Sequence, residues 1–497
     1  MMNGVNLFAS QPDLRLILPT VHGNVDYHEF RLQLEQIDQV LYASGLEDNF
    51  IKESVKTWLA PMPSYKQADA RQQIKYQERC SRALRCNIAR DLLGENYRGF
   101  SLRLADSPLL QWFCGMDRLA VIQVPSKSEL QRFATLLPQE KLRPLIDQLT
   151  ANAALAPARI GLEEALDLDA YFVDTTCVKT NIHYPVDWVL LRDGTRTLLK
   201  ATILIRKHGL KNRMESPEDF MCRMNRLCIQ MTHTRRKADG KKQRKVVLRL
   251  MKRIVKTVKE HARKHRDLLD QEWKKTDWTR PQAQQVIDRI DGVLERLPKA
   301  EDQAHERIIG ERQVANGQKV VSLYETDTQI IVRGKTGAEV EFGNTLLLVE
   351  TPQGLIVEWN LFKDSACADC AQLKDTVANL EKAIGLKVNA ICGDRGFDSR
   401  ENQRWLDENK IFNGICPRSP KDLKKRMEEE KFADLQKRRS QTEGRIAIVK
   451  NKFLGRPMRS KGFKNRQTGV AWGVLTHNLW CLARLRCAQE QERLLAA

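Results

Sequence analysis

The chain has 497 residues, of which 42% are hydrophobic, and it carries a formal net charge of +20. This composition predicts a folded protein of about three domains and excludes a disordered chain, and no stretch approaches the roughly 18 consecutive apolar residues of a membrane span. The positive charge makes nucleic acid the expected partner, well ahead of an acidic protein or a membrane surface.

The start of the chain, "MMNGVNLFASQPDLRL", lacks the basic segment and long apolar core of a secretory signal. Together with twelve cysteines this predicts a reducing compartment, and we expect a cytoplasmic location. Cys367 and Cys370 form a Cys-x-x-Cys pair without a second pair at zinc-ribbon spacing, and His261 and His265 lack the glutamate of a zinc-binding helix motif. We therefore expect buried thiols and a solvated helix face, and no zinc site.

Residues 1–155 have mostly helical periodicity and are predicted to form an all-α N-terminal domain that binds DNA. Long helices are expected over residues 27–45 and 67–94, each ending near a glycine. Two shorter helices are expected on either side of Pro138, with Ser126 as the N-cap of the first. This pair fits a helix-turn-helix and an ordinary helical hairpin equally well, so both interpretations stay open.

The pattern changes at "AYFVDTTCVKTNIHY", where aromatic and β-branched residues predict a strand. Residues 195–205 fit either a second strand or the start of a helix. From residue 206 to about 312 the chain is helical and strongly basic, and residues 221–260 contain 14 Lys or Arg but only 2 Asp or Glu. We expect this basic helical block to bind the DNA backbone.

Strand patterns resume at residue 319. A helix with Gly385 as its stop follows, then a short strand that ends on Asp394, a helix, another short strand, a helical stretch over residues 421–450 and a long final helix. The first part of this region predicts an antiparallel meander of four strands, "KVVSLYE", "TQIIVRGK", "EVEFGNTLLLVET" and "LIVEWNLF".

This order of elements is that of a ribonuclease-H-like α/β domain, a mixed sheet flanked by helices. We expect residues 165–205 and 313–490 to form this catalytic domain. The basic helical block, residues 206–312, is then an insertion that interrupts it after its first strands.

Three acidic residues fall where such a domain would need carboxylates. Asp174 lies in the first strand, Asp394 ends a later strand, and Glu443 lies on the helix that follows. Phosphodiester chemistry uses two divalent ions about 3.5–4 Å apart, and Mg²⁺ prefers carboxylate oxygens with several waters. Each acid alone is weak evidence, because an Asp at a strand end is more often a turn or capping residue.

The neighbours of Glu443 strengthen this hypothesis. At 100° per residue, Gln436, Arg439, Glu443 and Lys450 fall within about 60° of one another on a helix. Such a face would hold a metal ion through the carboxylate and grip phosphates through the two cations. The alternative is an ordinary ion pair of Arg439 with Glu443 on a solvated face, which gives the other two residues no part. The residues alone leave both interpretations open.

The sequence resembles a known family at these positions. The spacing Gln-x2-Arg-x3-Glu-x6-Lys around Glu443 closely resembles the Tyr-x2-Arg-x3-Glu-x6-Lys signature of DDE transposases of bacterial insertion sequences. The segments "FVDTTCVKTNIHYPVD" and "ICGDRGFDS" are similar to the first-Asp and second-Asp segments of that family. The similarity covers residues 105–485.

The resemblance implies that Asp174, Asp394 and Glu443 are the catalytic, metal-binding triad. It implies that Arg439 and Lys450 contact transposon-end DNA. Gln436, at the position of the signature tyrosine, and Arg395, for which an ion pair with a nearby acid is the alternative, complete the predicted DNA contacts.

The resemblance also implies a cofactor and partners. The cofactor is Mg²⁺, as two ions for which Mn²⁺ can substitute, and the partner is double-stranded DNA, both the transposon ends and the target. A homodimer or higher oligomer on paired ends is expected, with cleavage followed by strand transfer through the liberated 3′-hydroxyl.

The chain departs from the family pattern in two ways. Gln436 replaces the signature tyrosine and so removes an aromatic ring from that position. Only 48 residues separate Asp394 from Glu443, which leaves no room for the β-rich insertion of the best-known branch, whereas 219 separate Asp174 from Asp394. The additional length here is the basic helical block.

Two alternative functions remain. A ribonuclease-H-like nuclease that cleaves without joining would give no strand-transfer product, and a domesticated, non-catalytic DNA-binding protein would tolerate loss of the acids. Among nearby residues, we expect Asp398 to cap a helix and Asp187 to stand in a turn. Trp273, Trp278 and Trp405 are expected to pack against apolar neighbours and not to stack on bases.

Overall fold

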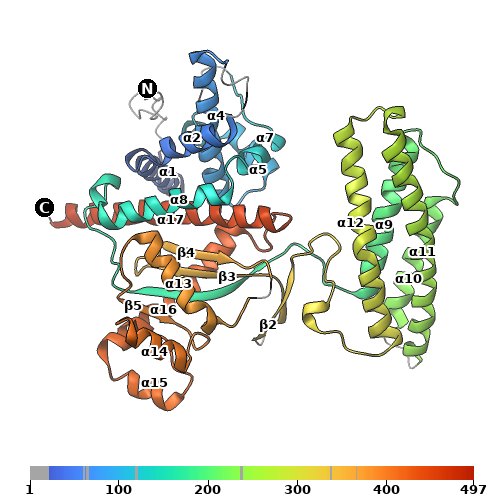
Figure 1. The fold of residues 1–497 in the computed structure, drawn as a ribbon. Helices are drawn as coiled ribbons and strands as arrows, with labels where there is room; N and C mark the ends of the chain where they lie inside the picture. Colours follow the sequence, from blue (N-terminus) through green and yellow to red (C-terminus); the bar gives the residue numbers. More distant parts are fainter. Residues whose placement is uncertain are drawn as a thin grey trace. The chain divides into compact units, whose positions relative to one another are not determined.

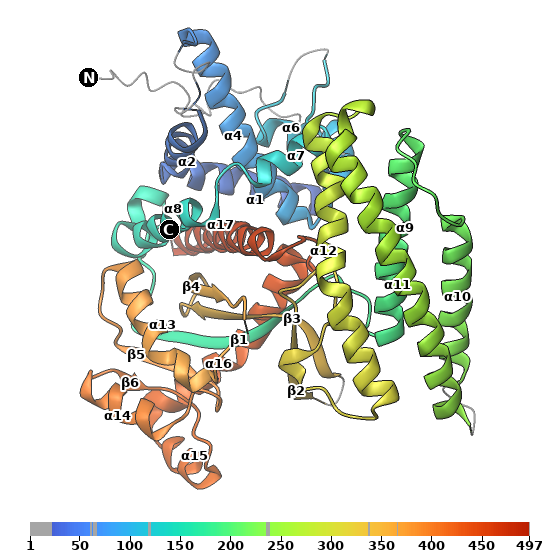
Figure 2. The ribbon, with the colours of Figure 1, turned by 45° about the vertical axis from the view of Figure 1, so that its right-hand side comes forward.

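The structure is a computed structural model that describes residues 22–59, 62, 67–117, 121–234, 239–335, 338–364 and 366–496. The described residues fall into two compact units (Figures 1 and 2). Unit 1 lies within residues 1–179 and 345–497, and unit 2 comprises residues 180–344. Over these ranges no helix combines the length and hydrophobicity needed to cross a bilayer.

Unit 1 begins with a helical region, as the sequence predicts. The first two long helices end where expected, because Gly45 and Gly94 follow them in the left-handed conformation, with φ of +66° and +63°. Ser126 accepts a hydrogen bond from the backbone N–H of Glu129 and caps α7, as predicted. The elements are α1 Val25–Ala43, α2 Leu46–Ser54, the π-helical η2 Val55–Leu59, α4 Ala70–Leu93, α5 Tyr97–Asp106, α6 Pro108–Phe113, α7 Lys127–Ala134, α8 Gln139–Leu155 and the 3₁₀ turn η3 Pro157–Ile160.

A mixed sheet follows, which confirms the predicted α/β class. Its strands run in the order β2-β3-β1-β5-β6, and β4 pairs with β3. Strand β3 is antiparallel to β2 over its first half and to β4 over its second, whereas β1, β5 and β6 are parallel to one another. The strands are β1 Tyr171–Lys179, β2 Gln329–Lys335, β3 Ala338–Glu350, β4 Ile356–Leu361, β5 Ala390–Gly393 and β6 Phe412–Asn413.

Helices cover both faces of this sheet. On one face α13, Asp369–Ile384, and α14, Arg400–Glu408, share an apolar cluster with Tyr171 and Val173 of β1. On the other face Phe172 clusters with residues of β5 and with Leu435 of α16, Glu430–Ile448. The alternation of β1 side chains therefore sends even-numbered residues toward α16. The remaining elements here are α15 Pro420–Arg426 and the π-helical η7 Val449–Leu454.

The last helix, α17, Phe463–Ala496, packs on α1, α4 and α8, from the opposite end of the chain, and on β4 (Figure 1). The indole N–H of Trp472 donates to the carbonyl of Ala134 at 3.0 Å, and its ring lies 5.8 Å from that of Phe50. The same buried cluster includes Leu346 and Trp359 of the sheet. One core thus joins the N-terminal helices to the sheet.

A buried arginine fixes the packing of the first helices. Arg85 of α4 is 1% exposed and forms two parallel hydrogen bonds to Glu47, at 2.7 and 2.6 Å, and one to Asp38, at 2.6 Å. Burial alone lowers the pKa of Arg85, but the charges of Glu47 and Asp38 outweigh it, and the net shift is upward. The guanidinium is therefore held as a cation that links α4 to α1 and α2.

Two local predictions are wrong. Residues 319–325 form no strand: the side chain of Gln303 takes both backbone bonds of Val320, at 2.6 and 3.2 Å, and Ser322 Oγ accepts from the backbone N–H groups of Tyr324 and Glu325. Asp398 does not cap α14, since Ser399 accepts the hydrogen bond from Asn402 N. Asp398 instead accepts from the backbone N–H of Arg418 at 2.9 Å.

Unit 2 contains a bundle of four helices that lies between β1 and β2 in the chain (Figure 2). Residues 195–205, for which the sequence allowed a strand or a helix, belong to its first helix and pack in its apolar core. Val286, Ile290, Val293 and Leu297 line the core, as their spacing predicts. The bundle comprises α9 Asp187–Lys207, α10 Pro217–Thr234, α11 Gly240–Glu272 with the 3₁₀ turn η4 Trp273–Lys275, and α12 Arg280–Ala304, followed by the π-helical η5 His305–Ile309 and the 3₁₀ turn η6 Asn316–Gln318.

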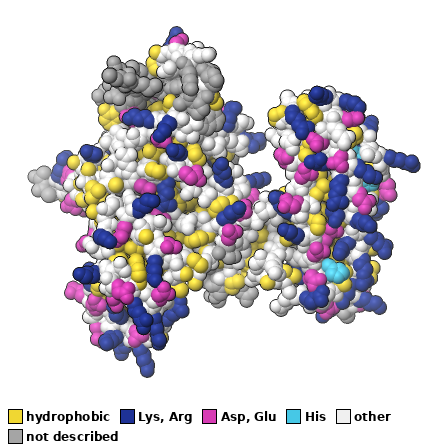
Figure 3. Space-filling model, in the orientation of Figure 1, with side chains coloured by type: hydrophobic (Ala, Val, Ile, Leu, Met, Phe, Trp, Pro, Cys, Tyr) yellow, Lys and Arg dark blue, Asp and Glu magenta, His cyan; other side chains and the backbone are white. Residues whose placement is uncertain are grey.

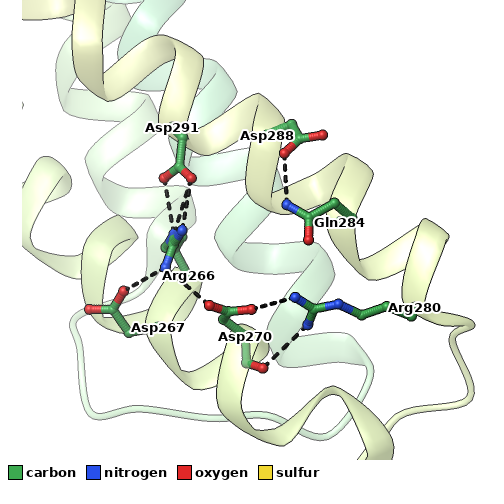
Figure 4. Close-up of polar contacts among 7 residues, drawn as sticks. All are labelled: Arg266, Asp267, Asp270, Arg280, Gln284, Asp288 and Asp291. Carbon is green, nitrogen blue, oxygen red and sulfur yellow. Dashed lines mark hydrogen bonds and ion pairs between the residues drawn. The ribbon is translucent and has the colours of Figure 1, made fainter.

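Close packing and ion pairs hold the bundle together. A Cβ on Gly194 of α9 would lie 2.7 Å from Leu297 Cδ1 of α12, so a larger residue at this position would require Leu297 to move. Arg266 of α11 bonds both oxygens of Asp291 on α12, and Asp270 pairs with Arg280 at 2.8 Å (Figure 4). Lys and Arg side chains are spread along the visible face of the bundle (Figure 3).

Replacing Arg85 by Met should lower the free energy of unfolding by about 3–5 kcal/mol, because the two buried carboxylates of Asp38 and Glu47 lose the guanidinium that they share. Arg82→Met, on the same helix, is the matched control: its pair with Glu78 is half-exposed and should contribute at most about 1 kcal/mol. Urea unfolding followed by circular dichroism measures both. Equal losses for the two variants would contradict the role given to Arg85.

Candidate active site

Two aspartates meet on neighbouring parallel strands. Strand β5 ends at Gly393, and Asp394 follows at its carboxyl end. Continuing the register by one residue sets Asp394 beside Asp174 of β1, on strands about 4.8 Å apart. Partners across parallel strands point to the same face, so the two carboxylates lie together. The pairs that fix this register are Tyr171 with Ile391, Phe172 with Cys392 and Val173 with Gly393.

The face that carries Asp174 is the one covered by α16. Two residues earlier on β1, the ring of Phe172 lies 4.7 Å from the guanidinium of Arg438. Two residues later, Thr176 Oγ1 accepts a hydrogen bond from Lys450 Nζ at 3.0 Å. Because side chains of a strand alternate, Asp174 points to the same side as these two residues. It therefore faces the middle of α16.

That middle stretch contains Arg439 and Glu443. The pKa of Asp174 is raised to about 6, first by burial and then by the negative charge of Asp394, with a smaller contribution from Glu443. A hydrogen bond from the backbone N–H of Thr175, at 2.6 Å, and the positive charge of Arg439 act in the opposite direction. All three predicted acids and the predicted arginine are thus close enough to influence one carboxyl group.

The donor set fits a divalent cation with incomplete protein coordination. Among the residues that the structure describes, which include all three acids, no group of three His, Cys, Asp or Glu side chains converges tightly enough to hold a metal ion. The pair of aspartates remains, and the repulsion between their like negative charges is only partly neutralised. Mg²⁺ is commonly bound through one or two carboxylates plus waters and substrate phosphates, so Asp174 and Asp394 suit it. The cation would relieve the repulsion that raises the pKa of Asp174.

A hydrogen-bond pair fixes one side of α16. Gln436 Nε2 donates to the carbonyl of Gly414, after β6, at 2.7 Å, and its Oε1 accepts from Arg439 Nε at 3.2 Å. The amide group of Gln436 is therefore fully used within the protein. It ties the helix to the sheet edge and orients the guanidinium of Arg439.

A buried glutamate that the sequence analysis missed anchors the other side. Glu350, at the end of β3, is 5% exposed and accepts hydrogen bonds from Thr442 Oγ1 at 2.8 Å and from Arg438 Nη2 at 3.2 Å. Arg445 adds a hydrogen bond to the carbonyl of Gln353. An acid at the end of the apolar run "LLLVE" was the available signal. These contacts hold α16 across β1 and leave Glu443 exposed.

The geometry of the helix changes before it reaches Lys450. The chain turns from α-helix to π-helix at Val449, so 100° per residue no longer applies beyond that point. Lys450 lies in this π-helical turn, η7, and still reaches β1 through Thr176. The structure thus brings Lys450 to the acidic site by a route that helical periodicity does not describe.

Two further residues border the second aspartate. Arg395 follows Asp394 directly and is exposed, and its carbonyl accepts from Arg418 Nε at 3.1 Å. Asp369, at the start of α13, is a fourth acid that the sequence analysis overlooked. A Cβ on Gly396 would meet Asp369 Oδ2 at 2.7 Å and Asp394 Oδ1 at 2.9 Å, so both carboxylates flank the same glycine.

The other residues singled out in the sequence pack or form hydrogen bonds within the protein. Asp187 lies at the start of α9 in unit 2, where it accepts hydrogen bonds from Gln303 and Arg307. Trp273 and Trp278 pack against the bundle core, and Trp405 packs against the cluster beneath α13, as expected. Two expectations are wrong here: His265 does not lie on a solvated face but is buried, where it bonds the carbonyl of His261, and Cys367 is not a buried thiol but an exposed one just before α13, with Cys370 half-buried.

Comparison with known protein families finds a match to the Transposase DDE domain over residues 290–479. The matched range contains Asp394, Glu443 and α16, whereas Asp174 precedes it. No curated protein and no solved structure matches the chain. The chain therefore contains a transposase DDE domain, and such a domain implies metal-dependent DNA cleavage and strand transfer.

The raised pKa of Asp174 predicts a pH dependence of stability. The native carboxyl titrates near pH 6 and not at its usual 3.8, so the folded state binds the proton more tightly and loses stability as the pH rises from about 4 to 6. In EDTA, Asp174→Asn should therefore be more stable than wild type at pH 8 by about 1–3 kcal/mol, and equally stable near pH 4.

Urea unfolding in EDTA at several pH values measures this difference. Asp434→Asn, an exposed aspartate on α16, is the matched control and should show no such trend. A stability difference for Asp174→Asn that does not grow with pH would refute the electrostatic account.

Proposed function

We propose that the protein is the transposase of a bacterial insertion sequence. It binds the terminal inverted repeats of its element, cleaves the DNA ends by two-metal-ion phosphodiester hydrolysis and joins the 3′-hydroxyl ends to target DNA. The observation that carries the proposal is the pairing of Asp174 and Asp394 on parallel strands opposite the helix that bears Arg439 and Glu443. The family match to residues 290–479 supports it.

The topology supports a ribonuclease-H-like catalytic domain. An antiparallel segment, β3 with β4, borders β1, and the parallel strands β5 and β6 follow on its other side, with helices on both faces. The helical bundle enters the chain between β1 and β2. This order is the one expected of that fold with one insertion, because the bundle interrupts the chain without separating the strands that carry the aspartates.

In this proposal Asp174, Asp394 and Glu443 hold the divalent ions, two Mg²⁺ that Mn²⁺ can replace. When bound, the ions would supply Lewis-acid stabilisation of the charge that develops on the phosphate. Asp174 and Asp394 are the two proposed ligands that the paired strands already hold side by side. Glu443, exposed on α16, completes the ligand set once DNA and metal are present.

The cations around the acids would bind DNA. Arg439 and Lys450 lie on the helix side of the site, and Arg395 is exposed next to the second aspartate, so together they could grip successive phosphates. Gln436 contributes by orienting Arg439, and a direct contact of its own with DNA stays a prediction.

The remaining parts of the proposal concern assembly. The helical region within residues 1–155 and the basic insertion, residues 206–312, bind DNA outside the cleavage site. A homodimer or higher oligomer pairs the two element ends in the bacterial cytoplasm. The high positive charge would steer this association.

Cleavage and joining of the DNA that flanks the gene, with Mg²⁺, test the proposal. Glu443→Gln should lower both activities by about 100-fold or more, the order found when one charge-stabilising group is removed from an active site, while end binding persists. The side chain is exposed, so the variant should fold. Glu430→Gln, at the start of the same helix, is the control and should remain active.

Each alternative function predicts a distinct result. Cleavage without joined product would favour a nuclease, and binding with neither activity in wild type would favour a non-catalytic DNA-binding protein. Equal cleavage and joining by wild type and Glu443→Gln would assign Glu443 to an ordinary ion pair.

The role of Gln436 is tested by a double-mutant cycle with Arg439. If Gln436 acts by orienting Arg439, then Gln436→Met should weaken end binding several-fold in wild type but have little effect in Arg439→Gln. The coupling free energy should be about 0.5–1.5 kcal/mol. Fluorescence anisotropy with labelled element ends measures it. Additive losses would instead indicate an independent contact of Gln436 with DNA.

A further inference from the structure

Unit 2 contains a cavity of about 770 Å³ that the proposed active site does not use. The start of α11 forms one wall, and the segment after α12 forms the others. Its volume lies within the range of small-molecule and cofactor sites. The lining residues are Lys241, Arg244, Arg307, Ile308, Glu311, Arg312, Gln313, Val314, Ala315, Asn316 and Lys319.

Positive charge exceeds negative charge around this cavity. Arg307 is balanced by Asp187 at 2.9 Å. Arg312 is likewise balanced by Glu306 at 2.5 Å. Glu311, by contrast, serves two lysines at once, Lys241 at 3.5 Å and Lys245 at 2.8 Å. One carboxylate cannot neutralise two ammonium groups, so one positive charge remains. Arg244 and Lys319 of the lining add two more.

Arg244 is the most informative residue of the lining. Its Nε is buried and has no hydrogen-bond partner in the described part of the chain. An unpaired buried donor on a charged group is costly, so native structures rarely keep one without a ligand or a functional reason. A guanidinium is suited to phosphate, whose oxygens accept parallel N–H bonds.

The backbone beside Arg244 is also irregular. The end of α12 becomes the π-helical η5, which contributes Arg307 to the lining, and π-helical turns are frequent at functional sites. Glu311 has φ of +53°, a left-handed conformation that is unfavourable for a residue with a Cβ. Hydrogen bonds from Gly310 N to His305 O and from Arg312 N to Glu306 O hold this turn. Such strain persists where the surrounding structure requires it.

We propose that this cavity binds a phosphate group, with Arg244 as its central ligand and Lys319 on the opposite wall. The phosphate is either a phosphodiester of the DNA backbone or a free phosphate or nucleotide. The DNA source rests on the proposed function, and the basic exposed side of α11 favours it; the phosphate chemistry itself does not depend on that function.

The test uses the full chain and two probes, labelled double-stranded DNA and inorganic pyrophosphate. Arg244→Gln and Lys319→Gln remove one charge each from the cavity, whereas Lys387→Gln removes an exposed charge after α13, outside the lining and outside both regions proposed to bind DNA. Both cavity variants should bind DNA about tenfold more weakly, and the slope of log K against log salt should fall by about 0.9. Lys387→Gln should change DNA affinity less than threefold.

The second probe separates the two sources. Pyrophosphate binding that both cavity variants lose, with DNA affinity intact, would assign the cavity to free phosphates or nucleotides. If no cavity variant differs from wild type with either probe, the proposal is wrong. Lys319, whose ammonium donates to Asn316 Oδ1 at 2.7 Å, carries the test if Arg244→Gln does not fold.

A cleavage assay of the wild-type protein on element ends distinguishes failure of the phosphate site from failure of the proposed function. Cleavage by wild type together with normal binding by the cavity variants would overturn the phosphate site alone. Loss of phosphate binding in the cavity variants, with a wild type that cleaves no ends, would leave the phosphate site standing and overturn the transposase proposal.

Discussion

The candidate site depends on the parallel pairing of β1 with β5. Their register sets Asp174 beside Asp394, and a slip of one residue would turn one carboxylate to the opposite face of the sheet. Such a slip is prevented because Phe172 and Val173 pack in different apolar clusters on the two faces. The hydrophobic alternation of one strand therefore fixes the position of its single acid. The repulsion between the two aspartates is a cost that this packing sustains and that a divalent cation would offset.

The helix across the site is held by contacts that are not themselves catalytic. Glu350 binds Thr442 and Arg438 on one side of α16, and Gln436 binds the carbonyl of Gly414 on the other. These anchors connect the helix to the antiparallel part of the sheet and to its parallel edge. With both sides fixed, the face between them is left for Arg439 and Glu443. Rigid support of this kind is what a site needs if charged groups are to stay close without neutralising one another.

The sequence predicted the helices and strands of this site better than the contacts between them. Asp394 and Glu443 stood in recognisable patterns because a strand end and an amphipathic helix have local signatures, and the mixed sheet followed from the order of elements. Glu350 and Asp369 were missed because their importance arises from contacts with segments distant in the chain. The strand predicted at residues 319–325 failed for a similar reason: a side chain, Gln303, supplied the hydrogen bonds that periodicity assigns to a neighbouring strand. Local patterns cannot reveal such a substitution.

The π-helical turns show a different limit of periodic reasoning. Segments η5 and η7 each continue an α-helix; η7 carries Lys450, which is proposed to bind phosphate, and η5 carries Arg307, which lines the basic cavity and pairs with Asp187. A π-helical turn contains more than 3.6 residues, so every side chain beyond its start is rotated relative to the preceding helix. Because of this rotation, a basic side chain points away from the helix face that 100° per residue would give it. It can then contact another element, as Lys450 contacts Thr176 of β1. A basic side chain at the end of a helix can thereby serve a site that the regular helix would miss.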